Sequence, residues 1–327
     1  MKIRFEKEII LILLSSFLST CTEDPGEIDG SFLSEKYPGD LGMENDPDVI
    51  WVENFEESSI SDILSRYEDY KNPDGMYFDD DVPALSSGSK SLALVAGGDQ
   101  EDATDFYKNF GEDGYEQWYI RWYVKYQANA EYHHTGVWFG GYHEPLNWPY
   151  PRAGTKPAGD DLFSIAIEPS FPGVLDFYNY WMKMRSWSDP PSSYWGNNLV
   201  HHSATYYDEE WICIEVYFKV NTYMNSGDGA ELTLWINDEF IVDFTGTSGL
   251  GHWVADKFCT EDSDLPSCTN YPPDEGEEMI PLDLQVRVIE ELKLNYLWPQ
   301  NYTTAEEQTT VWFDDIVIAN IRIGSLR

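Results

Sequence analysis

A run of aromatic, cationic and histidine side chains between residues 118 and 143 has the composition of a sugar-binding surface. Its first part alternates with a period of two, which is typical of a half-buried β-strand. One face of this strand is apolar, and the other carries Tyr119, Arg121, Tyr123 and Lys125. Pyranose rings stack on aromatic faces, and acidic sugars need positive partners. The alternative interpretation is a large β core with ordinary aromatic side chains on its outer face.

Histidine and tyrosine side chains nearby could perform acid–base chemistry. His133 and His134 follow on a second predicted strand, where neighbouring side chains point to opposite faces, so at most one of them is expected to reach a groove. A histidine titrates near neutral pH and can act as a general base. Tyr178 and Tyr180 share one face of a predicted strand over residues 175–185. They could act as proton donors, or they could be ordinary tyrosines at the edge of the core.

The elements that must position these side chains are predicted to be strands. The chain has no internal repeat and no sustained helical periodicity, whereas residues 162–168 and 211–220 form short apolar segments typical of strands. Residues 231–244 form a predicted hairpin that turns at Asn237-Asp238, because both residues tolerate positive φ. Short strands separated by turns predict an all-β fold, a concanavalin-like β-sandwich (jelly roll) with long loops, as a single domain over residues 49–327.

The N-terminal residues predict export from the cytoplasm. A basic start precedes a short apolar run from Ile9 to Leu18, which is too short to span a bilayer and is typical of a signal peptide. The four residues ending at Cys21 are similar to a bacterial lipobox, so residues 1–21 are interpreted as a lipoprotein signal peptide with Cys21 as the lipidated residue. A plain cleaved signal is the alternative. Residues 22–48 are predicted to be an acidic flexible tether. The expected location is the cell envelope or surface as a bacterial lipoprotein, or the medium as a secreted protein.

The other cysteines fit an exported protein. Cys259 and Cys268 lie in a loop-like segment and are predicted to form a local disulfide. Cys213 lies within an apolar strand and is predicted to be a buried free thiol. No cysteine or histidine spacing is typical of a zinc site. No cofactor is expected to be required, although the run of aspartates at residues 79–81 leaves a structural calcium ion open.

The charge of the chain argues against two classes of partner. The 59 acidic and 20 basic residues give a formal net charge of −39, so phosphate groups of nucleic acids and anionic membrane surfaces would be repelled. The chain is therefore expected to contact a membrane only through its lipid anchor, and to be a monomer. An anionic polysaccharide would also be repelled at long range, so it would need a local cationic patch.

The succession of motifs along the chain resembles a known group of enzymes. In order, the motifs are the Trp/Tyr/Lys strand, Gly140-Gly141-Tyr142, Tyr178-Asn179-Tyr180, a strand with Trp211, Glu215 and Lys219-Val220-Asn221, the Leu-Trp-Ile-Asn-Asp hairpin, and Val311 to Ile316. This order, over roughly residues 114–324, resembles the jelly-roll polysaccharide lyases of families 14 and 20, which are alginate- and glucuronan-lyase-like. The resemblance extends to secreted bacterial proteins of unknown activity.

The resemblance implies β-elimination on a uronic-acid polymer. This reaction needs a group that neutralises the C5 carboxylate, a base for the C5 proton and an acid for the leaving oxygen. The family-14 pattern has a Lys before Gly-Gly, then Ser-x-Arg, then Tyr-x-Tyr. Ser164 stands at the position of the serine, but Ala166 stands at that of the arginine, and the histidine pair occupies the lysine strand. The implied base is His133 or His134, and the implied acid is Tyr178 or Tyr180.

A binding surface is expected around this centre, with Arg121, Lys125 or Arg185 as the neutralising group. The complete set of predicted substrate-binding residues is Arg121, Tyr123, Lys125, Trp138, Tyr142, Trp148, Ser164, Trp181, Lys183 and Arg185.

Other functions remain open at this level. The first is a non-catalytic, cell-surface glycan-binding lipoprotein that uses the predicted tryptophans as stacking platforms, and the second is a structural envelope lipoprotein without a ligand. Carboxylate pairs such as Glu168 and Glu215 could suggest a glycosidase, but no single strand carries the Glu-x-Asp-x-x-Glu pattern that jelly-roll glycosidases use. The lyase hypothesis requires His134 and Tyr180 to converge on one groove.

Overall fold

Two β-sheets dominate the fold of this chain, seen in a computed structural model that describes residues 32–98, 101–143, 153–186, 193–200, 203–223, 229–245, 248–261, 263, 266–270 and 279–327. The first, called sheet 1, has eight strands, and all its pairings are antiparallel. In spatial order they are β13 (Glu239–Asp243), β12 (Glu231–Ile236), β11 (Ile212–Lys219), β6 (Gln117–Tyr126), β18 (Thr309–Ala319), β4 (Ser91–Ala96) and β3 (Met76–Asp79), while β1 (Val49–Glu53) pairs with β18 outside this order.

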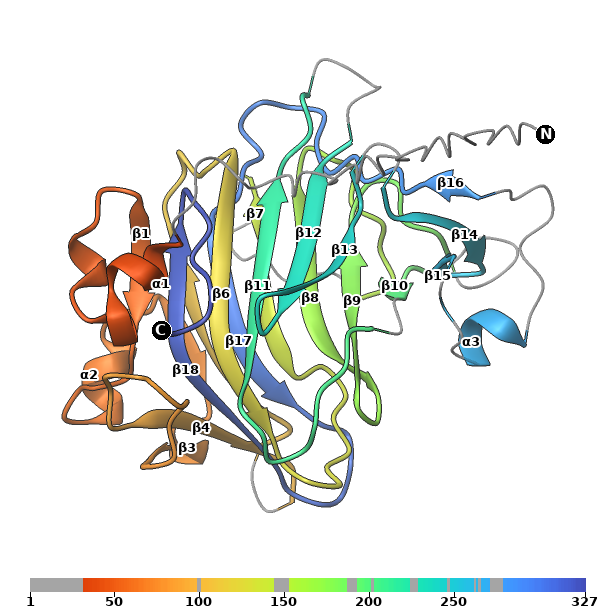
Figure 1. The fold of residues 1–327 in the computed structure, drawn as a ribbon. Helices are drawn as coiled ribbons and strands as arrows, with labels where there is room; N and C mark the ends of the chain where they lie inside the picture. The colour runs from red at the N-terminus through yellow and green to blue at the C-terminus, as the bar shows by residue number, and fades with distance from the viewer. Residues whose placement is uncertain are drawn as a thin grey trace, which may run out of the picture. The chain divides into compact units, whose positions relative to one another are not determined.

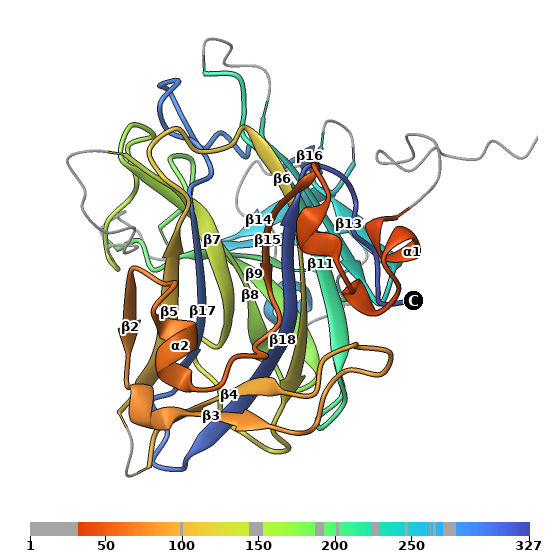
Figure 2. The ribbon, with the colours of Figure 1, turned by 90° about the vertical axis from the view of Figure 1, so that its left-hand side faces the viewer.

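The second sheet, called sheet 2, has ten strands. In spatial order they are β16 (Ile280–Pro281), β14 (Leu250–Val254), β15 (Lys257–Thr260), β10 (Asn197–Val200), β9 (Val174–Tyr180), β8 (Leu162–Phe171), β7 (Gly136–Tyr142), β17 (Tyr296–Tyr302), β5 (Ala103–Asn109) and β2 (Asp69–Lys71). The pairing of β10 with β15 is parallel and the other pairings are antiparallel. Figures 1 and 2 show the two sheets as separate layers of one sandwich, which confirms the predicted all-β jelly roll.

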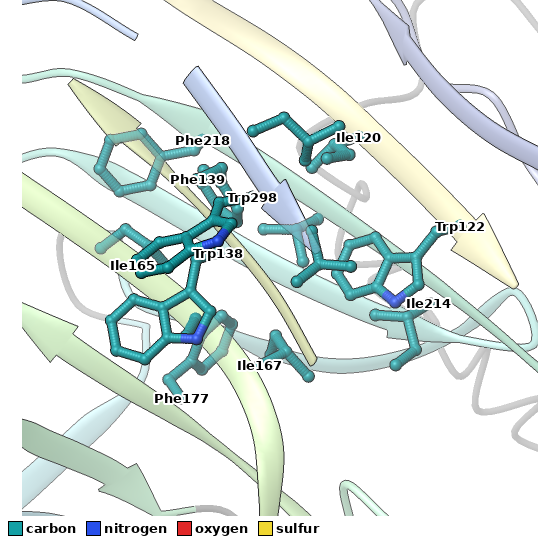
Figure 3. Packing of buried hydrophobic residues seen from close by; sticks show 14 of the residues in the cluster. Ile120, Trp122, Trp138, Phe139, Ile165, Ile167, Phe177, Ile214, Phe218 and Trp298 are labelled. Atoms are coloured by element: carbon teal, nitrogen blue, oxygen red, sulfur yellow. The ribbon is translucent and has the colours of Figure 1, made fainter. Parts of the chain in front are cut away.

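The space between the sheets is filled by large apolar side chains. Trp118 of β6 meets Phe139 of β7 with ring centroids 6.2 Å apart, and Phe218 of β11 stacks on Phe163 of β8 at 5.6 Å. Figure 3 shows part of this core, with Trp122 of sheet 1 facing the side chains of sheet 2. Aromatic pairs of this kind contribute about 0.5–1.5 kcal/mol each beyond the burial of their area.

Short helices cover parts of the sandwich, and the first of them correct a predicted boundary. The helical segments are α1 (Leu33–Lys36), the 3₁₀ turns η1 (Pro38–Asp40) and η2 (Met43–Asn45), α2 (Ile60–Leu64), the 3₁₀ turn η3 (Pro73–Gly75) and α3 (Pro266–Thr269). Leu33 and Met43 are buried against Tyr119, Trp235 and Val317 on the outer face of sheet 1. The prediction of a flexible tether is therefore wrong for residues 32–48, which are folded and belong to the compact unit of residues 31–327. Residues 1–31, with the signal peptide and Cys21, lie outside the described residues.

The aromatic and cationic face of β6 is also covered by the two ends of the folded unit. Arg121 is completely buried and forms an ion pair with Asp40 of η1. The hydroxyl of Tyr123 accepts a hydrogen bond from the backbone N–H of Leu326 at 2.8 Å.

Lys125, the other cation of this face, is also used within the fold. It pairs with Asp81, and its ammonium lies 4.3 Å from the ring centroid of Trp312. The expectation that Arg121, Tyr123 and Lys125 bind substrate is therefore wrong, because all three are buried in the structure, on the opposite sheet from the candidate acid–base residues.

Several smaller predictions are confirmed. Asn237 and Asp238 have φ values of 53° and 67° at the turn between β12 and β13, as a primed turn requires. Cys259 and Cys268 form a disulfide, and Cys213 is a buried free thiol.

Within the described part of the chain, none of the helices has the length and apolar character needed to cross a membrane.

The pair between Arg121 and Asp40 provides a test of how the N-terminal segment is held. Removing one partner of a buried ion pair leaves an uncompensated charge, so Asp40→Ala should lower the free energy of unfolding by about 3–5 kcal/mol. The control is Glu44→Ala, which removes an exposed carboxylate from the same segment and should change it by less than about 0.5 kcal/mol. Urea unfolding followed by tryptophan fluorescence measures both. Equal midpoints for the two variants would contradict the structural role of the pair.

Candidate functional site

Along each strand of sheet 2, the side chains point alternately into the core and to the opposite face of the sheet. We call this opposite face the groove face. On β8, Phe163 and Ile165 point into the core, whereas Ala166 and Glu168 lie on the groove face. The register places Ala166 directly between Trp138 of β7 and Tyr178 of β9. Over this small, completely buried side chain the rings of Trp138 and Tyr178 meet edge to face, with centroids 5.8 Å apart.

Two hollows lie side by side on the groove face, with volumes of about 480 and 470 Å³. Both fall in the range of ligand pockets, roughly 300–1,000 Å³. Four residues line both of them: His133, His134, Tyr178 and Trp195. The first hollow is completed by Lys71, Ala103, Asp105, Trp138, Ala153, Tyr180, Trp298, Gln300 and Tyr302. The second is completed by Tyr132, Glu168, Pro169, Ser170, Asp176, Asn198 and Lys257. The histidines and Tyr178 therefore mark the junction of one continuous groove.

The histidine pair lies in the connection between β6 and β7, and not on a strand. The backbone N–H groups of His133 and His134 both donate to the carbonyl oxygen of Tyr302, at 3.1 and 3.3 Å, which fixes the connection over the groove. Their rings lie 4.1 Å apart between centroids, and both line the hollows. The prediction that they point to opposite faces is wrong because the alternation of a strand does not apply to this bend.

His134 is oriented by a buried carboxyl group. Its Nδ1 lies 3.1 Å from Oε1 and 3.3 Å from Oε2 of Glu168. Burial raises the pKa of Glu168, and the contact with His134 acts in the opposite direction. When Nδ1 carries the proton and donates it to Glu168, the second ring nitrogen, Nε2, has a free lone pair. This arrangement is that of an oriented histidine base.

Tyr178 of β9 lies beside this histidine, and Tyr180 lines the same hollow, as expected for two residues on one face of a strand. The rings of Tyr178 and His134 have centroids 4.8 Å apart, and the hydroxyl oxygens of Tyr178 and Tyr180 are 3.5 Å apart. Burial, followed by the proximity of Tyr180, raises the pKa of Tyr178 well above its usual value. The Tyr178 phenol is therefore protonated at neutral pH and can donate a proton.

The remaining predicted site residues are dispersed. Trp138 lines the first hollow. Ser164 is buried and hydrogen-bonds the hydroxyl of Tyr296, so it does not line either hollow. Tyr142 is half-buried and accepts a hydrogen bond from Asn109 outside the hollows. Trp148 lies outside the described residues.

The predicted residues that follow β9 differ from expectation because the strand ends at Tyr180. Trp181 is fully buried and donates its indole N–H to the carbonyl of Asp283, so its interpretation as an exposed stacking platform is wrong. Lys183 is exposed, and the guanidinium of Arg185 lies 4.7 Å from the ring centroid of Trp253. Neither of these cations lines the two hollows.

Sequence reasoning missed most of the first hollow. Trp298, Gln300 and Tyr302 are every second residue of β17, and all three line this hollow. The period of two in this segment is the sequence pattern that could have placed them on one face. Asp105 follows the same rule on β5. Trp195 belongs to an irregular segment before β10 and is 47% exposed, and no sequence pattern distinguishes it.

The charges that line the groove are mostly acidic. Asp105, Glu168 and Asp176 contribute carboxyl groups, and Lys71 and Lys257 are the lysines among the lining residues. Burial raises the pKa of Asp105 to about 6. Over the ranges that the structure describes, no group of three or more His, Cys, Asp or Glu side chains is arranged to hold a metal ion.

Comparison with known proteins shows similarity of fold at low sequence identity. No protein-family model matches the chain, and no curated protein matches it. Among solved structures, the marine PL-14 alginate lyase from Aplysia kurodai is similar with a TM-score of 0.52 and 14% identity, over 83% of this chain and 98% of that chain. The alginate lyase vAL-1 from Chlorella virus has a TM-score of 0.49 and 12% identity, over 83% and 99% of the two chains. The endo-β-1,4-glucuronan lyase from the fungus Trichoderma reesei has a TM-score of 0.44 and 11% identity, over 83% and 95%. The described part of the chain thus has the jelly-roll fold found in a PL-14 alginate lyase.

Proposed function

We propose that this protein cleaves an acidic, uronic-acid polysaccharide by β-elimination. The observation that carries the proposal is the contact of His134 with Tyr178 at the junction of the two hollows, with Tyr180 beside Tyr178 in the first hollow. A polymer that lies along the groove would present one glycosidic bond to these three side chains and extend into a hollow on each side. The alginate lyase that shares the fold supports an acidic polysaccharide as the substrate class.

His134 is the proposed base. Its Nε2 takes the proton from C5 of the uronic sugar, while Nδ1–H donates to Glu168 and the carboxylate stabilises the imidazolium that forms. The electron pair of the broken C5–H bond forms the C4=C5 double bond, and the C4–O4 bond breaks. The reaction therefore needs no water or other co-reactant.

Tyr178 is the proposed acid, with Tyr180 beside it. Its phenol gives a proton to the leaving O4, and the proton held by His134 then restores the phenol through solvent. The hydroxyl of Tyr180, 3.5 Å away, can share the developing negative charge on the phenolic oxygen. These steps convert one polymer into two chains, one of which ends in an unsaturated uronate.

Trp195 is the proposed sugar-stacking platform, because its exposed ring borders both hollows. If the groove bound a glycan without cleaving it, the protein would be a glycan-binding protein.

An export route is supported by the disulfide between Cys259 and Cys268, which is typical of proteins outside the cytoplasm. The lipid anchor at Cys21 and an envelope location complete the proposal.

The proposed base gives the first test. His134→Ala should lower the rate of β-elimination by about 10²–10⁴-fold, the contribution of a general base. The rate is measured as the ultraviolet absorbance of the new C4=C5 double bond, with alginate and glucuronan as polymers. The control is His252→Ala on β14, which removes a histidine that does not line either hollow and should leave the rate unchanged. Wild-type protein that binds these polymers without producing the double bond would contradict the lyase and favour the glycan-binding alternative.

The packing of Gly196 against Tyr178 gives the second test. A Cβ atom on Gly196 would lie 2.2 Å from Cζ of Tyr178, and the φ of this glycine is +93°. Gly196→Ala should therefore displace the phenol and lower the rate of β-elimination. The matched control is Gly173→Ala, where φ is +77° but the nearest atom would lie 3.5 Å away.

Both glycine variants carry the cost of a left-handed alanine, about 1–2 kcal/mol. Displacement of the ring should cost Gly196→Ala about 1–3 kcal/mol more in urea unfolding. Equal stability and equal rates for the two variants would show that the position of Tyr178 does not depend on this contact.

A further inference from the structure

Three polar side chains form one row across the edge of the groove. The register pairs Asp105 of β5 with Lys71 of β2 on one side and with Gln300 of β17 on the other. All three line the first hollow, together with His134 and Tyr178. The row therefore faces the same space as the proposed base and acid.

Gln300 has a polar group that the fold does not use. The residue is only 6% exposed, yet its side chain makes no hydrogen bond with the described residues. Polar groups that border a hollow and make no hydrogen bond within the fold are normally satisfied by water or a ligand. Because Gln300 lines the hollow, its amide N–H groups are available to an acceptor on a bound sugar.

Asp105 can offer a second donor in the same place. It is 7% exposed, and burial raises its pKa to about 6, while the Trp298 indole and the Lys71 ammonium act in the opposite direction and Asp69 acts with burial. His133 also faces this hollow, and burial and the neighbouring His134 lower its pKa, so it adds little positive charge near neutral pH. A protonated Asp105 is a hydrogen-bond donor, whereas an ionised one would repel an anion.

We propose that Gln300 and Asp105 form the subsite that binds the carboxylate of a uronic sugar, with the Gln300 amide N–H and the Asp105 carboxyl O–H as donors. This inference rests on the proposed function and supplies its missing element, because the predicted neutralising cations Arg121 and Lys125 lie on sheet 1. Hydrogen bonds to the carboxylate draw electrons from C5 and stabilise the negative charge that develops there when the proton leaves. Lys71, at the exposed edge of the row, adds a long-range attraction.

The second hollow is a weaker candidate for this role. Its lysine, Lys257, lies 3.4 Å from the carboxylate of Asp256, and its acidic residues Glu168 and Asp176 are buried. Glu168 is engaged with His134, so a substrate carboxylate placed there would compete with the orientation of the base. The first hollow offers donors without this conflict.

The test is the affinity for alginate and glucuronan oligosaccharides, compared with the same oligosaccharides after reduction of their carboxyl groups to alcohols. Calorimetric titration of the full chain carrying Tyr178→Phe prevents turnover and keeps the ring. Gln300→Glu should weaken binding of the acidic oligosaccharides by about 10- to 100-fold, as expected for the loss of a hydrogen bond to a charged group, and leave the reduced ones unaffected.

Asp105→Asn gives an independent measurement because asparagine keeps a donor at every pH. The parent protein should lose affinity for the acidic oligosaccharides between about pH 5 and about pH 8, since Asp105 ionises in this interval, while Asp105→Asn should keep its affinity. The controls are Gln308→Glu and Asp80→Asn, which make the same chemical changes at exposed positions outside both hollows.

The outcomes separate this inference from the proposed function. Variants of Gln300 and Asp105 that bind acidic oligosaccharides as the Tyr178→Phe parent does, at both pH values, would overturn the subsite while β-elimination by the wild-type protein stands. A Tyr178→Phe parent that binds no acidic oligosaccharide, together with a wild-type protein that cleaves none, would overturn both.

Discussion

The register between the strands of sheet 2 is the constraint on which the groove depends. Each strand has one face in the core, so the burial of side chains such as Phe139, Phe163 and Ile165 fixes how far each strand is shifted relative to its neighbour. A shift of one residue would place core side chains in solvent. The same register decides which side chains share a row on the groove face, and it places Tyr178 and Trp138 on either side of Ala166. The geometry of the site is therefore a consequence of core packing on the opposite face.

The two outer faces of the sandwich differ in what covers them within the described residues. Residues 32–48 and the C-terminal residues pack on sheet 1, where Glu215 accepts hydrogen bonds from the backbone N–H groups of Ile323 and Gly324. Polar groups on that face are satisfied within the fold. Among the described residues, no such segment covers the two hollows on the groove face of sheet 2, and polar groups line them. A difference in what covers each face thus separates structural polar residues from candidate functional ones.

The sequence predicts the strands better than it predicts their surroundings. Strict alternation located β6, β11 and the hairpin of β12 and β13, because local patterning determines which side chains share a face. It also paired Tyr178 with Tyr180. Alternation cannot tell whether a face is open or covered by a distant segment, which is why Arg121 looked like a binding residue. Arg121 is covered by a segment some 80 residues earlier in the chain, where it pairs with Asp40. Such a contact depends on the tertiary structure and leaves no trace in the local pattern.

Residues in irregular connections were the least predictable part of the site. The position of His133 and His134 depends on two hydrogen bonds to the carbonyl of Tyr302, which is far away in the sequence. Trp195 and Gly196 lie between elements, and the role of Gly196 becomes evident only from its contact with Tyr178. Local patterns carry no information on such contacts.

Because the chain is strongly acidic, a groove that binds a polyanion must carry little negative charge where the substrate lies. At physiological ionic strength, charges more than about 8 Å apart are largely screened, so most of the net charge of −39 acts weakly on a bound sugar. The carboxyl groups inside the groove are not screened in this way and would dominate. Burial offsets part of this effect, because it raises the pKa of Asp105 to about 6 and so reduces the negative charge of the first hollow as the pH falls toward that value. An acidic protein can thus offer an anionic sugar a groove of neutral donors and aromatic rings, in which a few hydrogen bonds replace the arginine that Ala166 does not provide.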